Sequence, residues 1–487
     1  MIPMTLAEVA AVTGGRLAGP ATGAVVAGEV VTDSRDAAPG DLFVAFAGDH
    51  VDGHDYVAGA LAAGAVGALV SRPDAAPAEA RGRLVVVDDV AAALGTLARH
   101  VLGQVRAARG PHEQLRVVAV TGSVGKTTTK DLLAHLLAPL GERIAPPGSF
   151  NNEIGLPLTV LRTRPSTRTL VLEMGADRVG NLDYLTSIAP PDVAAVLAVG
   201  RAHLGEFGGI ENVARAKSEL VTGLLPHGTA VLNADDARVA AMAPLAPARV
   251  VTVGRGPGAS VRAQDVTVDD GGHARFTLTT AAGSAPVALA LVGEHHVTNA
   301  LAAAAVALEL GLPLGDVAAA LGTAGAASPH RMDVRTRADG VRIVDDSYNA
   351  NPDSMRAGLR ALAGLRGTDP AATRRVAVLG EMLELGADSA AEHADLGAQV
   401  ARLGVDLLVA VGAGTAPLAA AARAAAGSAP GATEVVQVPD VVAAAALLGT
   451  RLRAGDVVLL KGSNGSGIWR LADGLLAAGT GEGTMPS

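Results

Sequence analysis

Residues 117–129, VVAVTGSVGKTTT, restrict the fold more than any other part of the sequence. A Gly-rich turn lies here between an apolar strand and a segment in which Leu recurs at helical spacing. Gly122 and Gly125 allow backbone N–H groups to turn toward an anion, Lys126 adds a point charge, and the Thr127 hydroxyl suits Mg²⁺. This order of strand, glycine turn, Lys-Thr and helix is typical of a P-loop, which binds the phosphates of a nucleoside triphosphate.

The P-loop motif leaves the class of protein open. Val120 stands where the general G-x-x-x-x-G-K-T pattern has Gly. A chance Gly-rich turn between a strand and a helix is therefore the alternative interpretation. P-loops occur in switch GTPases, kinases and ligases alike, so the motif predicts a bound nucleotide but not a reaction.

The length and the hydrophobic patterning predict three α/β domains. A chain of 487 residues exceeds one ordinary core, at about 150 residues per domain. Residues 1–110 show short β-branched runs around an Ala-rich helical stretch, and residues 111–327 alternate apolar strands with helical periods, as parallel sheets do. Period-two alternation over 258–292 predicts an antiparallel ribbon added to that sheet. Residues 328–487 hold a second strand-and-helix series, which predicts a Rossmann-like domain.

Composition argues against several classes of protein. A net charge of -9 and a low content of aromatic residues disfavour nucleic acid as a partner. The absence of Cys excludes disulfides and thiolate nucleophiles and fits a reducing compartment. The apolar tracts are short, and the first residues lack the basic start and long apolar stretch of a signal peptide. We therefore expect a cytoplasmic protein that does not insert into a membrane.

Two side chains follow the strands that come after the P-loop. Glu173 ends the strand TLVLE, where its carboxylate suits Mg²⁺, and His203 follows the next strand, VAAVLAVG. The alternatives are a solvated strand-end carboxylate and an ordinary loop histidine. Lys217 lies in a predicted helix and, taken alone, is interpreted as an exposed lysine.

Several segments occur together in the order found in one known family. TGSVGKTTTK, FNNEIGLPLT, EMGA, AHLGEFGG and AKSEL follow one another through the middle of the chain, and PHRMDV, DDSYNANPDSM, LGEMLELG and LLKGSNGS follow later. This series resembles the Mur ligases, which extend the peptide stem of cell-wall precursors. The segment TDSRDAAPGDLFVAFAGDHVDGHDY, over 32–56, resembles the UDP-binding first domain of that family. The resemblance covers the whole chain.

The resemblance implies an ATP site and a metal site. The implied nucleotide-binding residues are Gly122, Ser123, Gly125, Lys126, Thr127, Thr128, Asn299, Arg331 and Asp346. The implied ligands of two Mg²⁺ ions are Thr127, Glu173, His203 and Lys217. Lys217 matches the lysine that the family carbamylates with CO₂, which turns a cation into a carboxylate-like group. Lys126, His203 and Lys217 are accordingly the implied catalytic residues.

The resemblance also implies substrate contacts. Ser34 and Arg35 match contacts to the uridine diphosphate, Asn151 and Asn152 are implied near the muramoyl substrate, and Asn349 and Asn351 near the second substrate. The alternative for the last two is turn-forming Asn beside Pro352. Two positions depart from the family pattern. His296 stands where the family often has Asn, which puts one adenine contact in doubt, and Asn464 stands where Arg is common.

Two segments refine the expected reaction. Residues 345–355 and 379–386 resemble the family members that add D-alanyl-D-alanine to UDP-N-acetylmuramoyl-tripeptide, and no D-N-P-R motif of the diaminopimelate-adding members is present. The implied reaction consumes ATP through an acyl phosphate and yields the UDP-linked pentapeptide, ADP and phosphate for peptidoglycan synthesis. We expect a monomer. The alternatives are another Mur-type or folylpolyglutamate-synthase-like ligase, or a nucleotide-binding regulator without catalysis.

Overall fold

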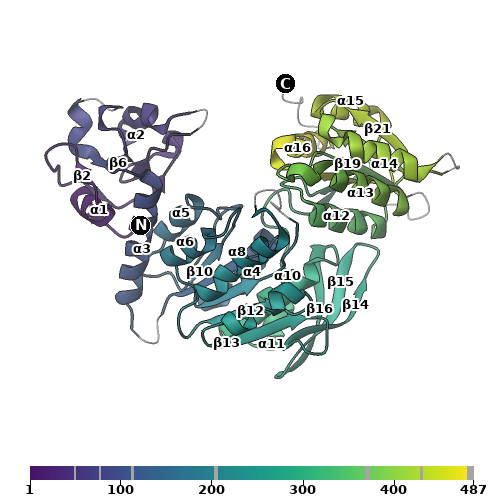
Figure 1. Cartoon of the computed structure of the whole chain (residues 1–487), viewed down its shortest axis with the longest axis horizontal. Helices are drawn as coiled ribbons and strands as arrows, with labels where there is room; N and C mark the ends of the chain where they lie inside the picture. The colour runs from purple at the N-terminus through teal and green to yellow at the C-terminus, as the bar shows by residue number, and fades with distance from the viewer. Residues whose placement is uncertain are drawn as a thin grey trace.

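The computed structural model consists of three α/β bodies arranged around a central sheet (Figure 1). It describes residues 1–48, 51–75, 78–110, 114–201, 207–367, 373–427 and 431–479. The N-terminal and C-terminal bodies both contact the central one and stand apart from each other (Figure 1). Among the helices of these described ranges, none combines the length and apolarity that a bilayer crossing requires.

The N-terminal body is a five-stranded sheet with the order β2-β7-β6-β5-β4. Its strands are β2 (Arg16–Leu17), β4 (Val30–Val31), β5 (Leu42–Val44), β6 (Gly67–Val70) and β7 (Leu84–Val86), and a separate pair is formed by β1 (Met4–Thr5) and β3 (Val25–Val26). The helices are α1 (Leu6–Thr13), α2 (Val57–Ala63) and α3 (Val90–Ala107). The β-branched runs predicted for this part, over 29–35, 41–46 and 83–89, contain strands β4, β5 and β7.

The central body is a nine-stranded sheet with the order β16-β15-β14-β13-β12-β11-β8-β10-β9. Its strands are β8 (Arg116–Thr121), β9 (Arg143–Ile144), β10 (Thr169–Glu173), β11 (Val193–Val196), β12 (Thr229–Asn233), β13 (Arg249–Gly254), β14 (Val261–Val268), β15 (His273–Thr280) and β16 (Gly283–Val292). Strands β8 to β13 are parallel, and β14, β15 and β16 pair antiparallel. The predicted ribbon is therefore confirmed, and it continues the parallel sheet beyond its edge strand β13.

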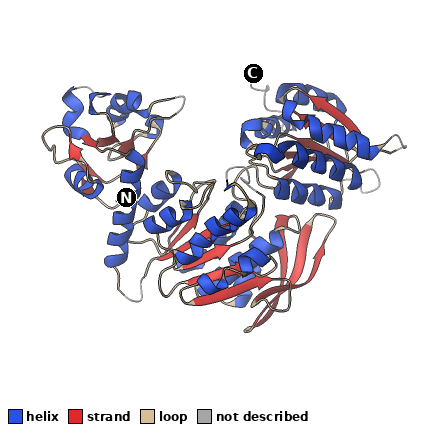
Figure 2. Ribbon diagram, viewed as in Figure 1, coloured by secondary structure: helices blue, strands red, loops and turns tan. Residues whose placement is uncertain are grey.

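Helices cover both faces of the central sheet (Figure 2). They are α4 (Lys126–Leu136), α5 (Gly155–Leu161), α6 (Asn181–Ile188), α8 (Ile210–Thr222), α9 (Ala237–Ala240), α10 (His296–Glu309) and α11 (Leu314–Leu321). Alternate residues of β8 enter different cores: Val117 and Ala119 pack with α5, α6 and α8, whereas Val118 and Val120 pack with α4 and α10. The Ala-rich stretch of α10 is buried against α4, because small side chains let two helices approach closely.

The C-terminal body is a six-stranded sheet with the order β17-β18-β22-β19-β20-β21, and only β17 is antiparallel. Its strands are β17 (Asp333–Thr336), β18 (Arg342–Asp345), β19 (Arg374–Leu379), β20 (Leu407–Val411), β21 (Glu434–Val438) and β22 (Asp456–Lys461). Helices α12 (Pro352–Gly364), α13 (Ser389–Arg402) and α14 (Ala416–Ala426) share one core, and α15 (Val441–Arg451) and α16 (Ile468–Gly479) share another. The two cores make it a doubly wound sheet, as predicted.

The first two bodies share a hydrophobic core. Leu94, Leu97 and Val101 of α3 belong to the same buried cluster as Leu156 of α5 and Leu185 of α6. Helix α3 thus joins the N-terminal sheet to the central one. The domain boundaries placed after residues 110 and 327 stay predictions. The site lies between the central and C-terminal sheets. The carboxyl ends of β8 and β10 face it from the central sheet, and those of β18 and β22 face it from the C-terminal sheet.

Candidate active site

The turn between β8 and α4 has the backbone geometry that an anion site requires. Gly125 caps α4 with φ +86, and a β-carbon there would lie 2.2 Å from Oδ1 of Asn299. Glycine is therefore required at this position for both its conformation and its size. A β-carbon at Gly122 would lie 2.9 Å from Cβ of Leu197. The Lys126 ammonium donates to the Gly122 carbonyl at 2.8 Å, which closes the loop at the start of α4.

A network of hydrogen bonds joins the P-loop to the end of β10. The Thr127 hydroxyl donates to Glu173 Oε2 at 2.9 Å, and both residues are buried. Ser149 Oγ donates to Glu173 Oε1 at 2.6 Å, and Asn151 Nδ2 donates to the same oxygen at 2.8 Å. A buried hydroxyl and a buried carboxylate beside a phosphate loop are the oxygen ligands that Mg²⁺ takes together with substrate phosphates.

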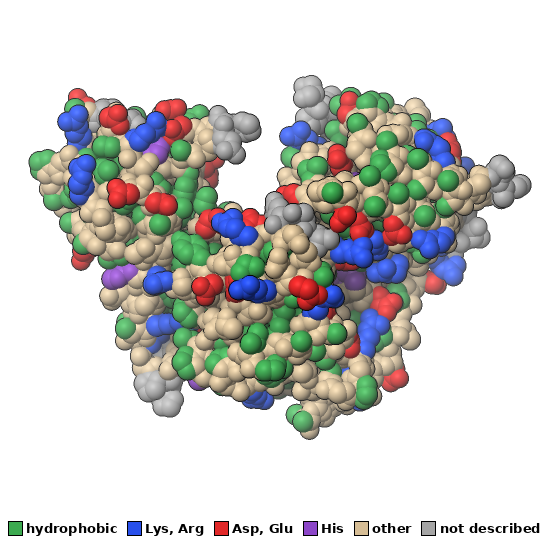
Figure 3. Space-filling view, in the orientation of Figure 1, with side chains coloured by type: hydrophobic (Ala, Val, Ile, Leu, Met, Phe, Trp, Pro, Cys, Tyr) green, Lys and Arg blue, Asp and Glu red, His purple; other side chains and the backbone are tan. Residues whose placement is uncertain are grey.

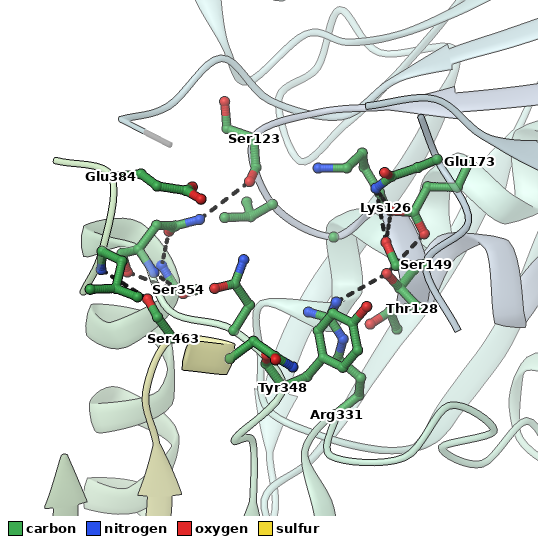
Figure 4. Close-up of a pocket in the computed structure, with 18 of the residues that line it drawn as sticks. Ser123, Lys126, Thr128, Ser149, Glu173, Arg331, Tyr348, Ser354, Glu384 and Ser463 are labelled. Carbon is green, nitrogen blue, oxygen red and sulfur yellow. Dashed lines mark hydrogen bonds between the residues drawn. The ribbon is translucent and has the colours of Figure 1, made fainter. Parts of the chain in front are cut away.

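Arg331 reaches this network from the C-terminal body (Figure 4). Its Nη2 donates to Thr127 Oγ1 at 3.2 Å, and its guanidinium carbon lies 4.1 Å from the ring centroid of Tyr348. The residues on either side, His330 and Met332, have φ of +59 and +51, which is unfavourable for side chains with a β-carbon. His330 is held by a 2.7 Å contact of Nδ1 with Asp345 Oδ2. The segment is therefore constrained in the conformation that presents Arg331.

Two adjoining cavities flank the P-loop. The first, of about 390 Å³, lies between the P-loop, Glu173 and the C-terminal body. It is lined by the predicted residues Ser123, Gly125, Lys126, Thr127, Thr128, Asn151, Glu173, Arg331, Asn349 and Asn351. The second, of about 280 Å³, is lined by Asn299, Arg331 and Asp346 among others. Arg331, Gly125 and Thr128 line both, so one extended ligand can occupy the two cavities across the loop.

The second cavity contains a buried ion pair and a buried histidine. Lys461 Nζ donates to Asp346 Oδ2 at 2.6 Å and to the Asn349 carbonyl at 3.0 Å, while burial lowers the pKa of Lys461. His296 Nδ1 lies 3.1 Å from Asn299 Nδ2. Burial lowers the pKa of His296 well below its ordinary value, so the ring is neutral and Nδ1 accepts that bond. Although His296 stands where the family often has Asn, Asn299 therefore still has a hydrogen-bond partner at this position.

Lys217 lies on the buried side of α8, with 3% of its surface exposed. The interpretation of an exposed lysine is therefore wrong, because tertiary packing covers the face that also carries Val213, Ala216 and Leu220. Burial, with a smaller contribution from the charge of Lys126, lowers the pKa of Lys217 to about 7. Lys217 lies outside the described lining of the two cavities.

His203 lies outside the residues that the structure describes. Among the described residues, no three or more metal-binding side chains form a cluster that could hold a metal ion.

Two predicted substrate residues accept hydrogen bonds from backbone N–H groups near helix starts. Asn152 Oδ1 accepts from the backbone N–H of Gly155 at 2.9 Å, at the start of α5, and Asn152 does not line either cavity. Asn351 caps α12 by accepting from Ser354 N at 2.9 Å, and its Nδ2 donates to the Ser123 carbonyl at 3.4 Å. Asn351 thus has the turn-forming role considered as its alternative and also contacts the P-loop.

Ser34 and Arg35 lie in a short 3-10 turn, Ser34–Asp36, on the N-terminal body. Arg35 is exposed and forms an ion pair with Asp33. Neither residue lines the cavities beside the P-loop. The molecular surface is hollowed between the N-terminal and C-terminal bodies (Figure 3). The structure therefore does not bring these two residues together with the P-loop.

Several residues of the site were not predicted. Ser149, Tyr348, Ser354, Glu384 and Ser463 line the first cavity. Tyr348, Ser354, Glu384 and Ser463 lie within segments that carry the family resemblance, which is the signal that could have found them, whereas Ser149 lies outside those segments. For the lysines, their rarity is a sequence signal. Apart from His, the basic side chains of the chain are Arg except for four Lys: Lys126, Lys130, Lys217 and Lys461. All four lie within or beside this site, and three are almost fully buried.

Comparisons with known families identify the class of protein. Residues 28–101 match the Mur ligase family, catalytic domain; residues 120–307 match the Mur ligase middle domain; and residues 330–464 match the Mur ligase, glutamate ligase domain. The chain belongs to the Mur ligase family.

Two relatives compared by sequence carry the same name, and two solved structures similar to this chain are of MurF. UDP-N-acetylmuramoyl-tripeptide--D-alanyl-D-alanine ligase of Mycobacterium tuberculosis is 48% identical over 509 residues, which cover 99% of each chain. The enzyme of that name from Escherichia coli (strain K12) is 36% identical over 85% of this chain and 86% of its own. Among solved structures, MurF from Acinetobacter baumannii has a TM-score of 0.82 at 35% identity and covers 97% of this chain and 99% of that one. MurF from Thermotoga maritima in complex with ADP has a TM-score of 0.75 at 30% identity, with coverage of 91% and 96%.

Proposed function

We propose that this chain is the ATP-dependent ligase that joins D-alanyl-D-alanine to UDP-N-acetylmuramoyl-tripeptide. One observation carries the proposal: the P-loop, the Thr127–Glu173 pair and Arg331 from another body converge on a single cavity. The choice of substrates rests on the full-length similarity to ligases of that name. We place the enzyme in the cytoplasm, as a monomer that supplies peptidoglycan synthesis.

The reaction proceeds in two steps. The terminal carboxylate of the tripeptide attacks the γ-phosphorus of ATP, the bond to the β–γ bridging oxygen breaks, and an acyl phosphate and ADP result. The amine of the dipeptide then forms the amide bond while phosphate leaves with the C–O bonding electrons. Both steps place negative charge on phosphoryl oxygens. The backbone N–H groups at the start of α4, together with Lys126 and Arg331, are placed to stabilise it.

The residues present fit a Mg²⁺ site. Thr127 and Glu173 offer buried oxygen ligands beside the phosphate loop, and we propose that His203 and carbamylated Lys217 complete the sites of two ions. Mg²⁺ held by these residues would neutralise negative charge on the phosphate. Carbamylation requires a neutral amine whose nitrogen attacks CO₂ and then loses a proton. A pKa of about 7 for Lys217 gives a sizeable neutral fraction near neutral pH, which supports this assignment.

The two cavities suggest how the substrates are arranged. We assign the adenosine part of ATP to the cavity lined by Asn299 and Asp346, with the triphosphate crossing the P-loop toward Lys126. Asn151 and Asn349 then face the reacting ends of the peptides in the larger cavity. Ser34 and Arg35 are assigned to the uridine diphosphate of the long tripeptide substrate.

A single assay tests the proposed function. Purified protein is given ATP, Mg²⁺, D-alanyl-D-alanine and UDP-muramoyl-tripeptide with either lysine or diaminopimelate as the third residue. We expect equal amounts of ADP and pentapeptide with at least one tripeptide, and neither product when folate and glutamate replace the peptides. A Lys126→Ala variant is the control and should lose about 10³-fold in rate or more, as phosphate-stabilising groups do. Absence of ADP and pentapeptide with the wild-type protein would refute the proposal.

A further inference from the structure

We infer that Arg201 fixes the position of the C-terminal body on the central one and thereby sets how tightly the nucleotide binds. Arg201 is not among the described residues that line the two cavities beside the P-loop, so it acts as a positioning residue. The inference rests on the proposed function for the identity of the nucleotide. It concerns the segment 198–201, which follows β11 and connects the P-loop to helices α12 and α13.

The segment 198–201 is attached to the P-loop by three hydrogen bonds. Ser123 N donates to the Ala198 carbonyl at 2.9 Å. The Ser123 hydroxyl accepts from Gly200 N at 2.8 Å and lies 3.2 Å from the Gly200 carbonyl, to which it donates. Ser123 is buried at the edge of the larger cavity (Figure 4). The segment is therefore fixed relative to the phosphate loop.

Arg201 links the same segment to the C-terminal body in two ways. Its backbone N–H donates at 3.0 Å to Oδ2 of Asp353, in the first turn of α12. Its guanidinium forms an ion pair with Glu392, in the first turn of α13. The buried Glu392 also accepts from Arg356 Nη2 at 2.7 Å. Loss of the Arg201 side chain therefore leaves Glu392 with a partner inside its own body, and that body should keep its fold.

The start of α12 lies next to the residues that the C-terminal body contributes to the nucleotide site. Asp346 is in the loop just before α12 and lines the second cavity. In the same loop, Tyr348 N donates to the His330 carbonyl at 3.2 Å, which joins this loop to the segment that carries Arg331. A restraint on the first turn of α12 therefore restrains both Asp346 and Arg331. Attachment at one edge still permits the body to rotate about that edge.

The effect on nucleotide affinity follows from how often the two bodies are docked in this way. Where only a fraction of the molecules has the binding-competent arrangement, the apparent Kd rises by the inverse of that fraction. The Arg201 side chain is 56% exposed, so its ion pair is screened by solvent and contributes modestly. Removing it should weaken nucleotide binding without abolishing it, and salt should reduce the difference.

Calorimetric binding of a non-hydrolysable ATP analogue with Mg²⁺ to the full chain tests the inference. For Arg201→Met we expect the Kd to rise about twofold to fivefold at low salt, and the ratio to the wild-type value to approach one in about 1 M salt. In a double-mutant cycle, Glu392→Gln should add less to Arg201→Met than it does to the wild type, because both changes remove the same pair. Arg238→Met breaks an exposed pair with Glu211 inside the central body, so it is the matched control and should bind as the wild type does.

A distance measurement separates a change in the position of the body from a local effect. The chain has no Cys, so Asp183→Cys on α6 and Val442→Cys on α15 provide two unique sites for spin labels. Both side chains are exposed. Double electron–electron resonance should give a narrow distance distribution with Arg201 present and a broader one after Arg201→Met.

Several results would overturn the inference. These are an unchanged Kd or distance distribution in Arg201→Met, strictly additive effects of Arg201→Met and Glu392→Gln, and an equal loss of affinity in Arg238→Met. Neither the binding nor the distance measurement requires ligase activity. A wild-type protein that makes no pentapeptide would therefore refute the proposed function, while the role of Arg201 would still be decided by these two measurements.

Discussion

The lysine ammonium groups beside the P-loop have pKa values that depend strongly on their surroundings. Burial lowers the pKa of Lys126, Lys217 and Lys461 below that of an ordinary lysine. The negative charge of Glu173 offsets part of this effect at Lys126, and that of Asp346 does so at Lys461. At Lys217 the nearby Lys126 lowers the pKa further, to about 7. Predictions about single residues therefore centre on Lys217.

Carbamylation of Lys217 should depend on pH. Only the neutral amine attacks CO₂, so at a fixed concentration of dissolved CO₂ the carbamate should increase as the pH rises through about 7. The measurement is ¹³C NMR of the metal-free protein with ¹³C-labelled CO₂. Lys217→Met should remove the signal, and Lys130→Met should retain it. A carbamate signal of equal size in the wild type and in Lys217→Met would contradict the assignment.

Lys217 should also reduce stability in a pH-dependent way. The unfolded chain keeps this proton up to the ordinary lysine value of 10.5, whereas the folded protein loses it near 7. The unfolded state therefore binds more protons between these values, and the cost of burying Lys217 falls as the pH rises through this window. In CO₂-free buffer, Lys217→Met should raise the free energy of unfolding by on the order of a few kcal/mol at pH 7, and by less at pH 9. Chemical denaturation at both values provides the measurement, and a gain that grows with pH would contradict the prediction.

Among the elements, helix α4 connects the P-loop to two distant segments through Lys130 and Asp131. Lys130 is 2% exposed, and its Nζ donates to the Pro146 carbonyl at 2.8 Å and the Gly148 carbonyl at 3.0 Å. Asp131 Oδ2 accepts from Ser328 N at 3.1 Å, just before the segment that carries Arg331. The same helix thus holds the loop leading to Ser149 and the connection to the C-terminal body.

Removing the Lys130 ammonium should disturb both segments. Lys130→Met removes the partner of the Pro146 and Gly148 carbonyls and the 2.7 Å ion pair of Lys130 Nζ with Asp131 Oδ1, so we expect the free energy of unfolding to fall by roughly 3–5 kcal/mol. The KM for ATP and for UDP-tripeptide should rise together, because Ser149 and Arg331 are no longer held. Denaturant unfolding and steady-state kinetics measure these effects. His135→Ala, an exposed residue of the same helix, is the control and should cost about 1 kcal/mol or less. Equal effects of the two variants would argue against the role of Lys130.

In the whole molecule, the three bodies differ in how they meet. The N-terminal and central bodies share an extended apolar core through α3, whereas the core of the C-terminal body includes Val292 of β16 from the central body, and other contacts between these two bodies are polar. Arg331 reaches Thr127, and Arg201 forms an ion pair with Glu392 while its backbone N–H donates to Asp353 at 3.0 Å. Polar interfaces within a chain permit relative motion more readily than a shared hydrophobic core.

We therefore expect the C-terminal body to move toward the N-terminal one when substrates bind. An acyl phosphate must be shielded from water, and the hollow between these bodies is open (Figure 3). Small-angle scattering should give a smaller radius of gyration with a non-hydrolysable ATP analogue and UDP-tripeptide than without them. Lys126→Ala, which should bind the analogue weakly, is expected to stay extended at the same concentrations. Identical profiles of the wild-type protein with and without ligands would contradict closure.

Local patterns in the sequence were sufficient for much of the fold. Strand, glycine turn and helix are consecutive at the P-loop, so residues 117–129 predict it without any distant partner. Period-two alternation predicts the ribbon of β14, β15 and β16 for the same reason. The carboxylate of Glu173 was predictable because the ends of parallel strands gather at one edge of a sheet.

Only the tertiary structure decided how distant segments meet. Thr127 and Arg331 are far apart in sequence yet share a hydrogen bond, and no periodicity encodes that pairing. The burial of Lys217, which sets its pKa, arises from elements packed over α8 and not from the helix itself. The hydrogen bonds of Asn152 near the start of α5 and of Asn351 as the cap of α12 likewise depend on where those helices begin. Sequence periodicity determines elements because it acts over a few residues, whereas a site formed between two bodies depends on contacts that form only when the chain has folded.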